Sequence, residues 1–400
     1  MSWLSVIGIG EDGTAGLSAA ARERVQRAEL LVGGQRHLAM IPPSSAERLT
    51  WTSPLQDTLP KILAWRGRRV VVLASGDPMW FGIGPTLSQH VAPEDMIVLP
   101  HVGAFSLAAA RLNWPLADTA TISLHGRPLD MLALNLTPGQ RLLALSEDRH
   151  MPRAVADYLT ARGWGPSRLI VHEHLDGPKE RRIEGTAESW AHEPGADLNI
   201  IAVICIPGPE AVILPRVPGL PDSVFLNDGQ LTKRQVRAAT LAALAPLPGQ
   251  MLWDVGAGCG SIGIEWMRAA ERATAIAIER HAARRDYIQR NAATLGVPGL
   301  RLVAGEAPDA LADLPAPDAI FIGGGLSTPG LIERCLDAVR PGGRVVANAV
   351  TAGSAALLAA LHGRHGGMLV RISVARMEEM GTNQNWRELK PITQWAWSRR

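Results

Sequence analysis

Glycines cluster after a short apolar segment in the second half of the chain, in the run Gly256-Ala-Gly258-Cys-Gly260-Ser-Ile-Gly263. Glycine lets the backbone turn tightly and approach a bound molecule closely, and the N-terminus of a following helix offers unpaired amides to polar groups. The pattern therefore predicts a ligand at the end of this strand. Its spacing, Gly258-x-Gly260-x-x-Gly263, also matches the fingerprint that holds the pyrophosphate of a dinucleotide.

Two acidic residues near this loop weigh against a nicotinamide dinucleotide. Asp254 lies two residues before the first glycine, and Glu279 ends the next expected strand, where it could accept hydrogen bonds from ribose hydroxyls. The last two strands expected in the chain, Met368–Ala375 and Ile392–Trp397, are moreover predicted to be antiparallel, which does not fit another mononucleotide-binding unit. A glycine turn that only packs a helix on a sheet is the alternative.

The first half carries two further glycine turns. Ile7-Gly8-Ile9-Gly10-Glu-Asp-Gly13 has the same glycine spacing, but the next helix is expected only at about Ser18, so these glycines do not open a helix as a dinucleotide loop does. The run Ala74-Ser-Gly76-Asp77-Pro78 follows an apolar strand directly. Glycine and proline set a sharp turn there, and Asp77 can cap a following helix; a plain capped turn is the alternative.

Histidines and cysteines predict no metal site. His172 and His174 alternate on an expected strand and would face the same side, but no third ligand can be identified. The chain has three cysteines, Cys205, Cys259 and Cys335, an odd number with no C-x-x-C pair. This pattern favours a protein of the reducing cytoplasm over a secreted one.

The elements that would position these residues predict two α/β domains. A stretch rich in proline and glycine at 207–224 is expected to be a linker between domains 1–206 and 225–400. Before it, apolar runs predict six strands, at Leu4–Ile9, Val70–Leu73, Met96–Leu99, Arg141–Leu145, Leu169–His172 and Ile200–Ile206, with helices that include Ser18–Glu29 and Phe105–Leu112.

The second half alternates more regularly and predicts an open parallel sheet. Its expected helices are Thr232–Ala245, Ile262–Ala270, Ala282–Leu295 and Pro329–Val339. Its expected strands are Met251–Val255, Thr274–Ile278, Leu300–Val303, Ala319–Ile322 and Arg344–Ala349. The runs Met368–Ala375 and Ile392–Trp397 follow with only a short polar stretch between them, and are expected to form an antiparallel pair.

Composition limits the classes of partner. Lys plus Arg number 40 against 38 for Asp plus Glu, so the chain lacks the positive field of a general nucleic-acid binder. The apolar run Ile200–Ile206 is far shorter than the roughly 20 residues of a membrane span, and the N-terminus has no basic region before an apolar stretch. We expect no nucleic-acid and no membrane partner.

The glycine loop with Asp254 and Glu279 resembles the class I S-adenosylmethionine methyltransferases. Further segments also resemble the C-terminal half of the precorrin-6Y methyltransferase family: Asn227–Arg237, Gly323–Gly325, Pro341–Thr351, Asn385–Arg387 and Pro391–Trp395. The resemblance implies that Asp254 lies near the methionine ammonium, that Glu279 holds the ribose and that Glu306 lies at the adenine. The full set of implied cofactor contacts is Thr232, Asp254, Gly256, Ala257, Gly258, Cys259, Gly260, Glu279, Glu306 and Ala307.

The first half resembles the tetrapyrrole methylase family, also called class III methyltransferases. The resemblance rests on the glycine start of the chain, the Ser-Gly-Asp-Pro turn and the segment Pro100–Pro115, in this order. That family has two α/β lobes with S-adenosylmethionine in the cleft between them, so the implied contacts are Gly8, Gly10, Gly76, Asp77, Pro78, Phe105 and Ser106. Where the family usually has Pro-Gly and two small hydroxyl residues, this chain has His101, Gly103 and Ala104.

Together the halves resemble the decarboxylating precorrin-6Y C5,15-methyltransferase family of cobalamin biosynthesis. The implied fold is a two-lobed tetrapyrrole methylase domain followed by a class I Rossmann-like domain with a C-terminal antiparallel strand pair. The implied reaction is methylation of precorrin-6B at C5 and C15 with decarboxylation of the ring C acetate, giving precorrin-8. The resemblance also implies one S-adenosylmethionine site per domain, a tetrapyrrole substrate and a cytoplasmic homo-oligomer. The fusion of the two halves favours a metal-free substrate, with a cobalt-containing one as the alternative.

No catalytic base is identified, because methyl transfer from a sulfonium needs chiefly an in-line carbon nucleophile at short distance. Arginines suited to substrate carboxylates are Arg234, Arg237, Arg376 and Arg387, each with a solvated surface position as the alternative. Rival functions are an RNA or other small-molecule methyltransferase, a nicotinamide-dependent oxidoreductase and a non-catalytic S-adenosylmethionine sensor.

Overall fold

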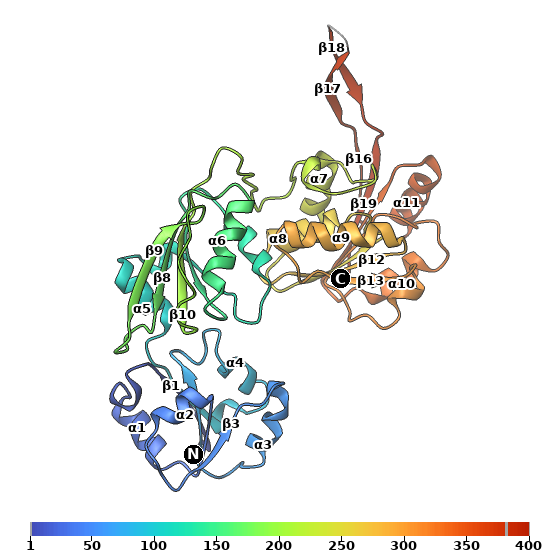
Figure 1. Cartoon of the computed structure of the whole chain (residues 1–400). Coiled ribbons are helices and arrows are strands. Elements are labelled where there is room, and N and C mark those ends of the chain that lie inside the picture. The colour runs from blue at the N-terminus through green and yellow to red at the C-terminus, as the bar shows by residue number, and fades with distance from the viewer. Residues whose placement is uncertain (1, 381–382, 400) are drawn as a thin grey trace. The chain divides into compact units, whose positions relative to one another are not determined.

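The computed structural model describes residues 2–380 and 383–399 and divides into two compact units (Figure 1). The first unit is formed by Met1–Leu129 and Thr137–Val212, and the second by Asp130–Leu136 and Ile213–Arg400. The predicted linker, 207–224, spans the change of unit after Val212 and contains a short 3-10 turn at Asp222–Val224. The seven residues from Asp130 belong to the second unit, although their sequence neighbours belong to the first.

The first unit begins with a five-stranded parallel sheet in the order β3-β2-β4-β1-β5. Its strands are β1 (Leu4–Ile9), β2 (Leu30–Gly33), β3 (Glu47–Thr50), β4 (Val70–Ser75) and β5 (Met96–Leu99). The accompanying helices are α1 (Ala19–Gln26), α2 (Gln35–Met40), α3 (Leu59–Leu63) and α4 (Gly84–Leu87). All six residues of β1 are buried, as expected for a central parallel strand with both faces covered.

The second sheet of this unit is mixed and has the order β6-β7-β10-β8-β9. Its strands are β6 (Thr119–Ser123), β7 (Arg141–Leu145), β8 (Arg168–Glu173), β9 (Arg181–Thr186) and β10 (Asn199–Ile204), and its helices are α5 (Ala104–Leu112) and α6 (Met151–Ala161). Only β6 and β7 run parallel; the other neighbours are antiparallel. Phe105 and Trp114 pack with strand residues such as Leu143 in the core of this lobe.

The second unit contains a seven-stranded sheet in the order β13-β12-β11-β14-β15-β19-β16. Its strands are β11 (Met251–Val255), β12 (Thr274–Glu279), β13 (Arg301–Ala304), β14 (Ala319–Ile322), β15 (Arg344–Ala349), β16 (Met368–Ile372) and β19 (Ile392–Ser398). Its helices are α7 (Arg234–Leu244), α8 (Ser261–Ala269), α9 (Ala282–Thr294), α10 (Leu331–Ala338) and α11 (Ala352–His365). The five strands β11 to β15 are parallel, and β19 is antiparallel to both of its neighbours. The predicted antiparallel pair at the end of the chain is therefore confirmed.

The polar stretch inside that pair is not a simple connection. It forms two further strands, β17 (Ala375–Met380) and β18 (Asn383–Glu388), which pair only with each other among the described residues. Figure 1 shows this ribbon extending well beyond the main sheet of its unit. None of the described helices has the length and apolarity that a membrane span requires.

Candidate functional site

The glycine loop of the second unit connects β11 to α8. Gly256, Gly258 and Gly260 have φ angles of +70°, +61° and +80°, a region that side-chain-bearing residues rarely adopt. Three such residues within five positions reverse the chain at the end of β11 and allow α8 to begin at Ser261. Replacing any of them would strain the turn.

Asp254 lies beneath this loop and is only 1% exposed. Its Oδ2 accepts a hydrogen bond from the Gly263 amide at 2.9 Å, whereas its Oδ1 is buried without a hydrogen-bond partner among the described residues. Burial raises the pKa of the carboxyl to about 7; the Gly263 amide opposes the rise and the negative charge of Glu279 adds to it. A buried acceptor without a donor is costly, and a ligand ammonium group has the chemistry that would satisfy it.

Glu279 ends β12 and is 4% exposed. Its Oε2 accepts a hydrogen bond from the Gly258 amide and its Oε1 one from the His281 amide, both at 2.9 Å. The two amides fix the orientation of the carboxylate and join the glycine loop to the end of β12. Because each carboxylate oxygen can accept more than one hydrogen bond, the group keeps capacity for a pair of ligand hydroxyls, as a ribose would supply.

These residues surround a cavity of about 1050 Å³ in the second unit. Predicted contact residues on its wall are Thr232, Gly256, Ala257, Gly258, Cys259, Glu279, Glu306 and Ala307. Asp254 and Gly260 are not among the lining residues, but Val255 and Gly256, which follow Asp254 in the chain, are. Further wall residues come from the strands on the other side of β11, among them Gly323–Gly325 after β14 and Asn348 on β15. Asn348 is held by a hydrogen bond to Thr240 Oγ1 at 2.9 Å and by one from Gln394 at 2.9 Å, so this side of the cavity is also rigidly supported.

Arg237, one of the arginines predicted to bind substrate carboxylates, is fully buried away from this cavity. Its Nε donates to Glu265 at 2.6 Å, and its Nη1 donates to Asp222 at 3.1 Å and to the Thr232 carbonyl at 2.6 Å. Its Nη2 donates to the Leu220 carbonyl. Four of the five N–H donors of the guanidinium are thus used within the fold, so the side chain stabilises the packing of α7 and does not face a substrate.

The other predicted arginines differ in position. Arg387 lies on the cavity wall, where its guanidinium pairs with Glu378 at 3.0 Å. Arg234 donates to the Gly219 carbonyl at 2.7 Å. Arg376 pairs with Asp222, which also pairs with Arg237. Of the four, Arg387 is therefore the one that the structure brings to the cavity.

Two lysines that were not among the predicted site residues also lie on this wall. Lys233 precedes the first residue of α7 and Lys390 lies just before β19. Neither ammonium has a hydrogen bond or ion pair among the described residues, whereas Arg280 and Arg284 on the same wall are paired with carboxylates at 2.9 and 2.8 Å. Their rarity was an available signal, because the whole chain contains only four lysines.

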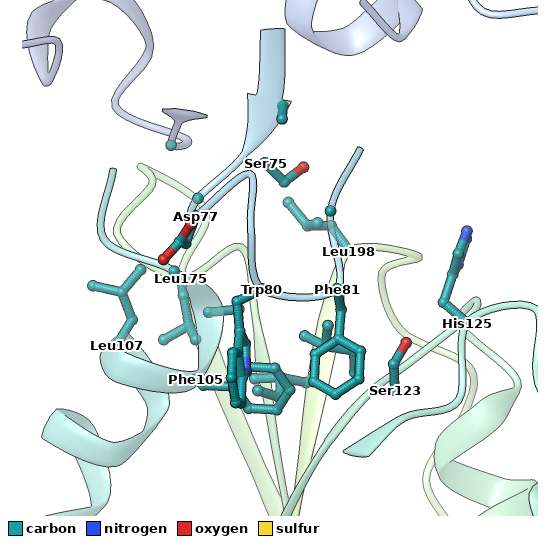
Figure 2. Close-up of a pocket in the computed structure, with 18 of the residues that line it drawn as sticks. Ser75, Asp77, Trp80, Phe81, Phe105, Leu107, Ser123, His125, Leu175 and Leu198 are labelled. Carbon is teal, nitrogen blue, oxygen red and sulfur yellow. The ribbon is translucent and has the colours of Figure 1, made fainter. Parts of the chain in front are cut away.

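A cavity of about 1420 Å³ lies in the first unit (Figure 2). It is lined by residues that follow β1, β4 and β5 of the first sheet, and by residues at the ends of β6, β7, β8 and at the start of β10 of the second sheet. Predicted contact residues on its wall are Gly10, Gly76, Asp77, Phe105 and Ser106. Both sheets of the unit therefore contribute to one site.

Gly8 and Pro78 were also predicted to touch the cofactor, but they lie behind this wall. A Cβ on Gly8 would collide with the Gly76 carbonyl oxygen, and a Cβ on Gly76 would lie 2.6 Å from the Cα of Gly103. Glycine is required here because three backbone segments approach closely. Asp77 accepts a hydrogen bond from the Met79 amide at 2.8 Å, so it closes a turn and does not cap a helix; α4 begins only at Gly84.

A charged network crosses this cavity from one sheet to the other. Glu11, after β1, pairs with Arg36 and lies 2.9 Å from Nδ1 of His174, after β8. Arg36 also donates to Ser75 Oγ at 3.0 Å and contacts His37 Nε2 at 2.9 Å. Burial and the positive charge of Arg36 lower the pKa of His37 to about 4, so this imidazole is neutral at pH 7. This network could not be predicted from the sequence, because its members are separated by up to 163 residues.

His172 and His174 do not form the pair that alternation on one strand predicted. His172 lies in β8 and is 2% exposed, and burial lowers the pKa of its imidazole. His174 lies beyond the last residue of β8, Glu173, and has a φ of +49°. The turn directs its ring to Glu11.

Comparison with known proteins matches both parts of the chain. Residues 4–191 match the family model Tetrapyrrole (Corrin/Porphyrin) Methylases, and residues 223–399 match the model Precorrin methyltransferase domain. The precorrin-6Y C(5,15)-methyltransferase (decarboxylating) of Sinorhizobium sp is 48% identical over 398 residues, which are 99% of this chain and 96% of that protein.

Two relatives each match a smaller part of the chain. A cobalt-precorrin-7 C(5)-methyltransferase of Salmonella typhimurium is 34% identical over 44% of this chain and 88% of its own length. A probable cobalt-precorrin-6B C(15)-methyltransferase (decarboxylating) of Pyrobaculum calidifontis is 36% identical over 34% of this chain and 71% of its own length. The predicted fold class and the predicted family are confirmed. The chain belongs to the family of precorrin-6Y C(5,15)-methyltransferases (decarboxylating), whose members use S-adenosylmethionine.

Proposed function

We propose that this chain binds one S-adenosylmethionine in each unit and methylates precorrin-6B twice. The first unit would methylate C5; the second would methylate C15 and release the ring C acetate carboxyl as carbon dioxide, so that the product is precorrin-8. The observation that carries the proposal is the pair of separate cavities, one in each unit, each beside a glycine turn at the ends of parallel strands. The family membership of the whole chain supports both activities.

In the second unit, the proposal assigns a role to each polar group around the glycine loop. The free Oδ1 of Asp254 would accept a hydrogen bond from the methionine ammonium, and Glu279 would accept hydrogen bonds from the ribose hydroxyls. The cofactor, when bound, supplies a methyl group on a sulfonium. The residues of this chain need only hold a carbon of the substrate in line with that methyl at short distance, because the neutral thioether is a good leaving group.

Decarboxylation breaks the bond between the acetate methylene and its carboxyl carbon. The electron pair of that bond passes into the conjugated macrocycle, which is later protonated, so no further cofactor is needed. The chain would hold the polycarboxylate in register through Lys233, Lys390 and Arg387, which line the cavity. Lysine ammonium groups without internal partners are available to substrate carboxylates.

We also propose a domain organisation, an oligomeric state and a cellular compartment for this enzyme. Domains 1–206 and 225–400 would each carry one methyltransferase site, in a cytoplasmic homo-oligomer that binds no nucleic acid. The net charge of +2 supports the absence of a nucleic-acid partner, and three buried cysteines that form no disulfide among the described residues fit a reducing compartment.

The first test is calorimetric titration of S-adenosylhomocysteine into the full chain. We expect two sites per chain in the wild type and one in either Asp254→Asn or Gly76→Val, with Gly363→Ala on α11 as a control whose added Cβ meets nothing within 4 Å. Anaerobic incubation with precorrin-6B and S-adenosylmethionine should then give a product with two added methyl groups and one carboxyl fewer by mass spectrometry. A single site in the wild type, or binding of NADH in place of S-adenosylhomocysteine, would contradict the proposal.

A further inference from the structure

Two large aromatic side chains are exposed on the wall of the cavity in the first unit. Trp80 is 55% exposed and Phe81 is 41% exposed, in the loop between β4 and α4. Figure 2 shows both rings beside Phe105. Burying aromatic rings of this size would contribute substantially to folding, so their exposure inside a cavity needs another explanation.

The backbone of this loop is held in an unfavourable conformation. Phe81 has a φ of +56°, which is rare for a bulky residue. The loop is closed by hydrogen bonds from the Met79 amide to Asp77 at 2.8 Å and from the Gly84 amide to the Pro78 carbonyl at 2.9 Å. A Cβ on Gly82 would lie 2.5 Å from that same carbonyl oxygen, so the loop has little room to relax. Strain that the surroundings maintain in this way is characteristic of functional positions.

The rings form a series from the core to the open cavity. Phe105 is buried in the core; its ring centroid lies 5.7 Å from that of Phe81, which in turn lies 5.5 Å from that of Trp80. The guanidinium of Arg127 lies 5.1 Å from the Phe81 ring centroid. No carboxylate pairs with Arg127 in the described part of the chain, so its charge is available to a ligand beside the aromatic surface.

We propose that Trp80 and Phe81 form a stacking surface for one face of the tetrapyrrole in the first unit, with Arg127 holding a carboxylate at the edge of the macrocycle. This inference rests on the proposed function. A flat conjugated ring system offers a large face to the two rings, and its acetate and propionate groups offer charges to the guanidinium. A cavity of about 1420 Å³ exceeds the size typical of a small-molecule site and has room for a macrocycle beside a cofactor.

Stacking would orient the substrate, so Trp80 is a positioning residue. With both reactants rigidly held, the ring plane fixes the angle at which the C5 carbon meets the methyl group. Loss of the indole should therefore affect both the affinity for the tetrapyrrole and the rate of the C5 step, but not the affinity for the cofactor.

The test compares full-length Trp80→Ala, Trp80→Phe and a control, Trp386→Ala, whose indole is 67% exposed on β18 of the other unit. Precorrin-6B is titrated anaerobically with S-adenosylhomocysteine present, so that binding occurs without turnover, and is then converted with S-adenosylmethionine. For Trp80→Ala we expect a KM for C5 methylation about tenfold higher, from the size of an aromatic stacking contribution. Decarboxylated product with a single methyl group should accumulate. Trp80→Phe should recover most of the loss, and Trp386→Ala should leave the C5 step unchanged.

Three outcomes would overturn the inference. Weaker binding of S-adenosylhomocysteine to Trp80→Ala with an unchanged tetrapyrrole KM would place the indole against the cofactor. Unchanged values for both ligands would leave the exposed rings without a ligand role. Absence of any methylation by the wild type would refute the proposed function itself, which separates the two failures.

Discussion

Replacement of Arg237 by methionine is expected to destabilise the second unit without a direct effect on substrate binding. Methionine preserves much of the length and apolar volume of the side chain but removes the charge and the four hydrogen bonds. The side chain of Glu265 would remain only 2% exposed, still bonded to the Gly219 and Leu220 amides but without a cation.

The size of the effect follows from this arrangement. Removing one partner of a buried ion pair costs about 3–5 kcal/mol, and the two remaining amides favour the lower end, about 3 kcal/mol. For a domain of 150–250 residues each kcal/mol shifts Tm by roughly 2–4 °C, so Tm should fall by about 6–12 °C. The matched control is Arg234→Met on the same helix, which is exposed and loses one hydrogen bond, to the Gly219 carbonyl. Its effect should stay below about 1 kcal/mol.

Differential scanning calorimetry of the full chain measures the shift, and hydrogen exchange monitored by mass spectrometry shows which unit is affected. Increased exchange should be confined to peptides of the second unit. Adding Glu265→Gln to Arg237→Met should recover part of the loss, because the uncompensated buried charge is then removed while the amide oxygen can still accept a hydrogen bond from a loop amide. If Arg237→Met changed Tm by less than about 2 °C and raised the substrate KM, this reasoning would be refuted, and Arg237 would instead be a substrate-binding residue.

Three further predictions concern the second unit and the thiols. The pKa of Asp254 is about 7 in the folded chain and lower in an unfolded one, so protonation favours the folded state. The cofactor-free unit should therefore lose stability as the pH rises from about 4 to about 7. Urea unfolding of Asp254→Asn should show this loss removed; identical pH profiles would contradict the raised pKa. Glu279→Gln should weaken S-adenosylhomocysteine binding at this site about tenfold by calorimetry, since hydrogen bonds to a charged group are lost, while exposed Glu271→Gln should not. Burial raises the pKa of the Cys205 and Cys335 thiols to about 12, so both should react with a disulfide reagent at about pH 8 only after unfolding. Rapid reaction of the native chain would show that these thiols are accessible.

Several of the buried parallel strands could be predicted closely from the sequence, but β2, whose four residues are all buried, was not predicted. The predicted bounds of β1, β5, β7, β11, β14 and β15 coincide with those observed. These strands are apolar runs between glycine turns and helices, and most of their residues are buried, except in β5, whose four residues are half-buried. A local pattern therefore carries most of the signal.

Strands with exposed or polar residues could not be found in this way. β9 (Arg181–Thr186) lies at a sheet edge and carries Arg181, Arg182 and Glu184, and β3 is largely exposed. The ribbon of β17 and β18 is mostly polar and pairs only with itself among the described residues. Such strands are stabilised by pairing with distant segments, which a local pattern does not reveal.

The candidate sites show the same division. Glycine turns and the acids at strand ends are local signals, and the sequence located both loops that line the cavities. Charge pairing is not local: Arg237 and Glu265 are 28 residues apart, and without that contact Arg237 could not be distinguished from a surface arginine. The exposure of Trp80 inside a cavity likewise becomes visible only once the two sheets are assembled.

The position of β19 in the sheet has a consequence for synthesis. β15 and β16 do not pair with each other; β19 lies between them and forms the hydrogen bonds of both. While the ribosome is making residues up to 391, these two strands have no common neighbour, and the site of the fully buried Trp395 stays open. The sheet of the second unit therefore closes only after its final strand has left the ribosome, whereas all strands of the first unit have been made long before. A nascent chain stalled before β19 would expose two unpaired strand edges, the state in which chaperone binding is most needed.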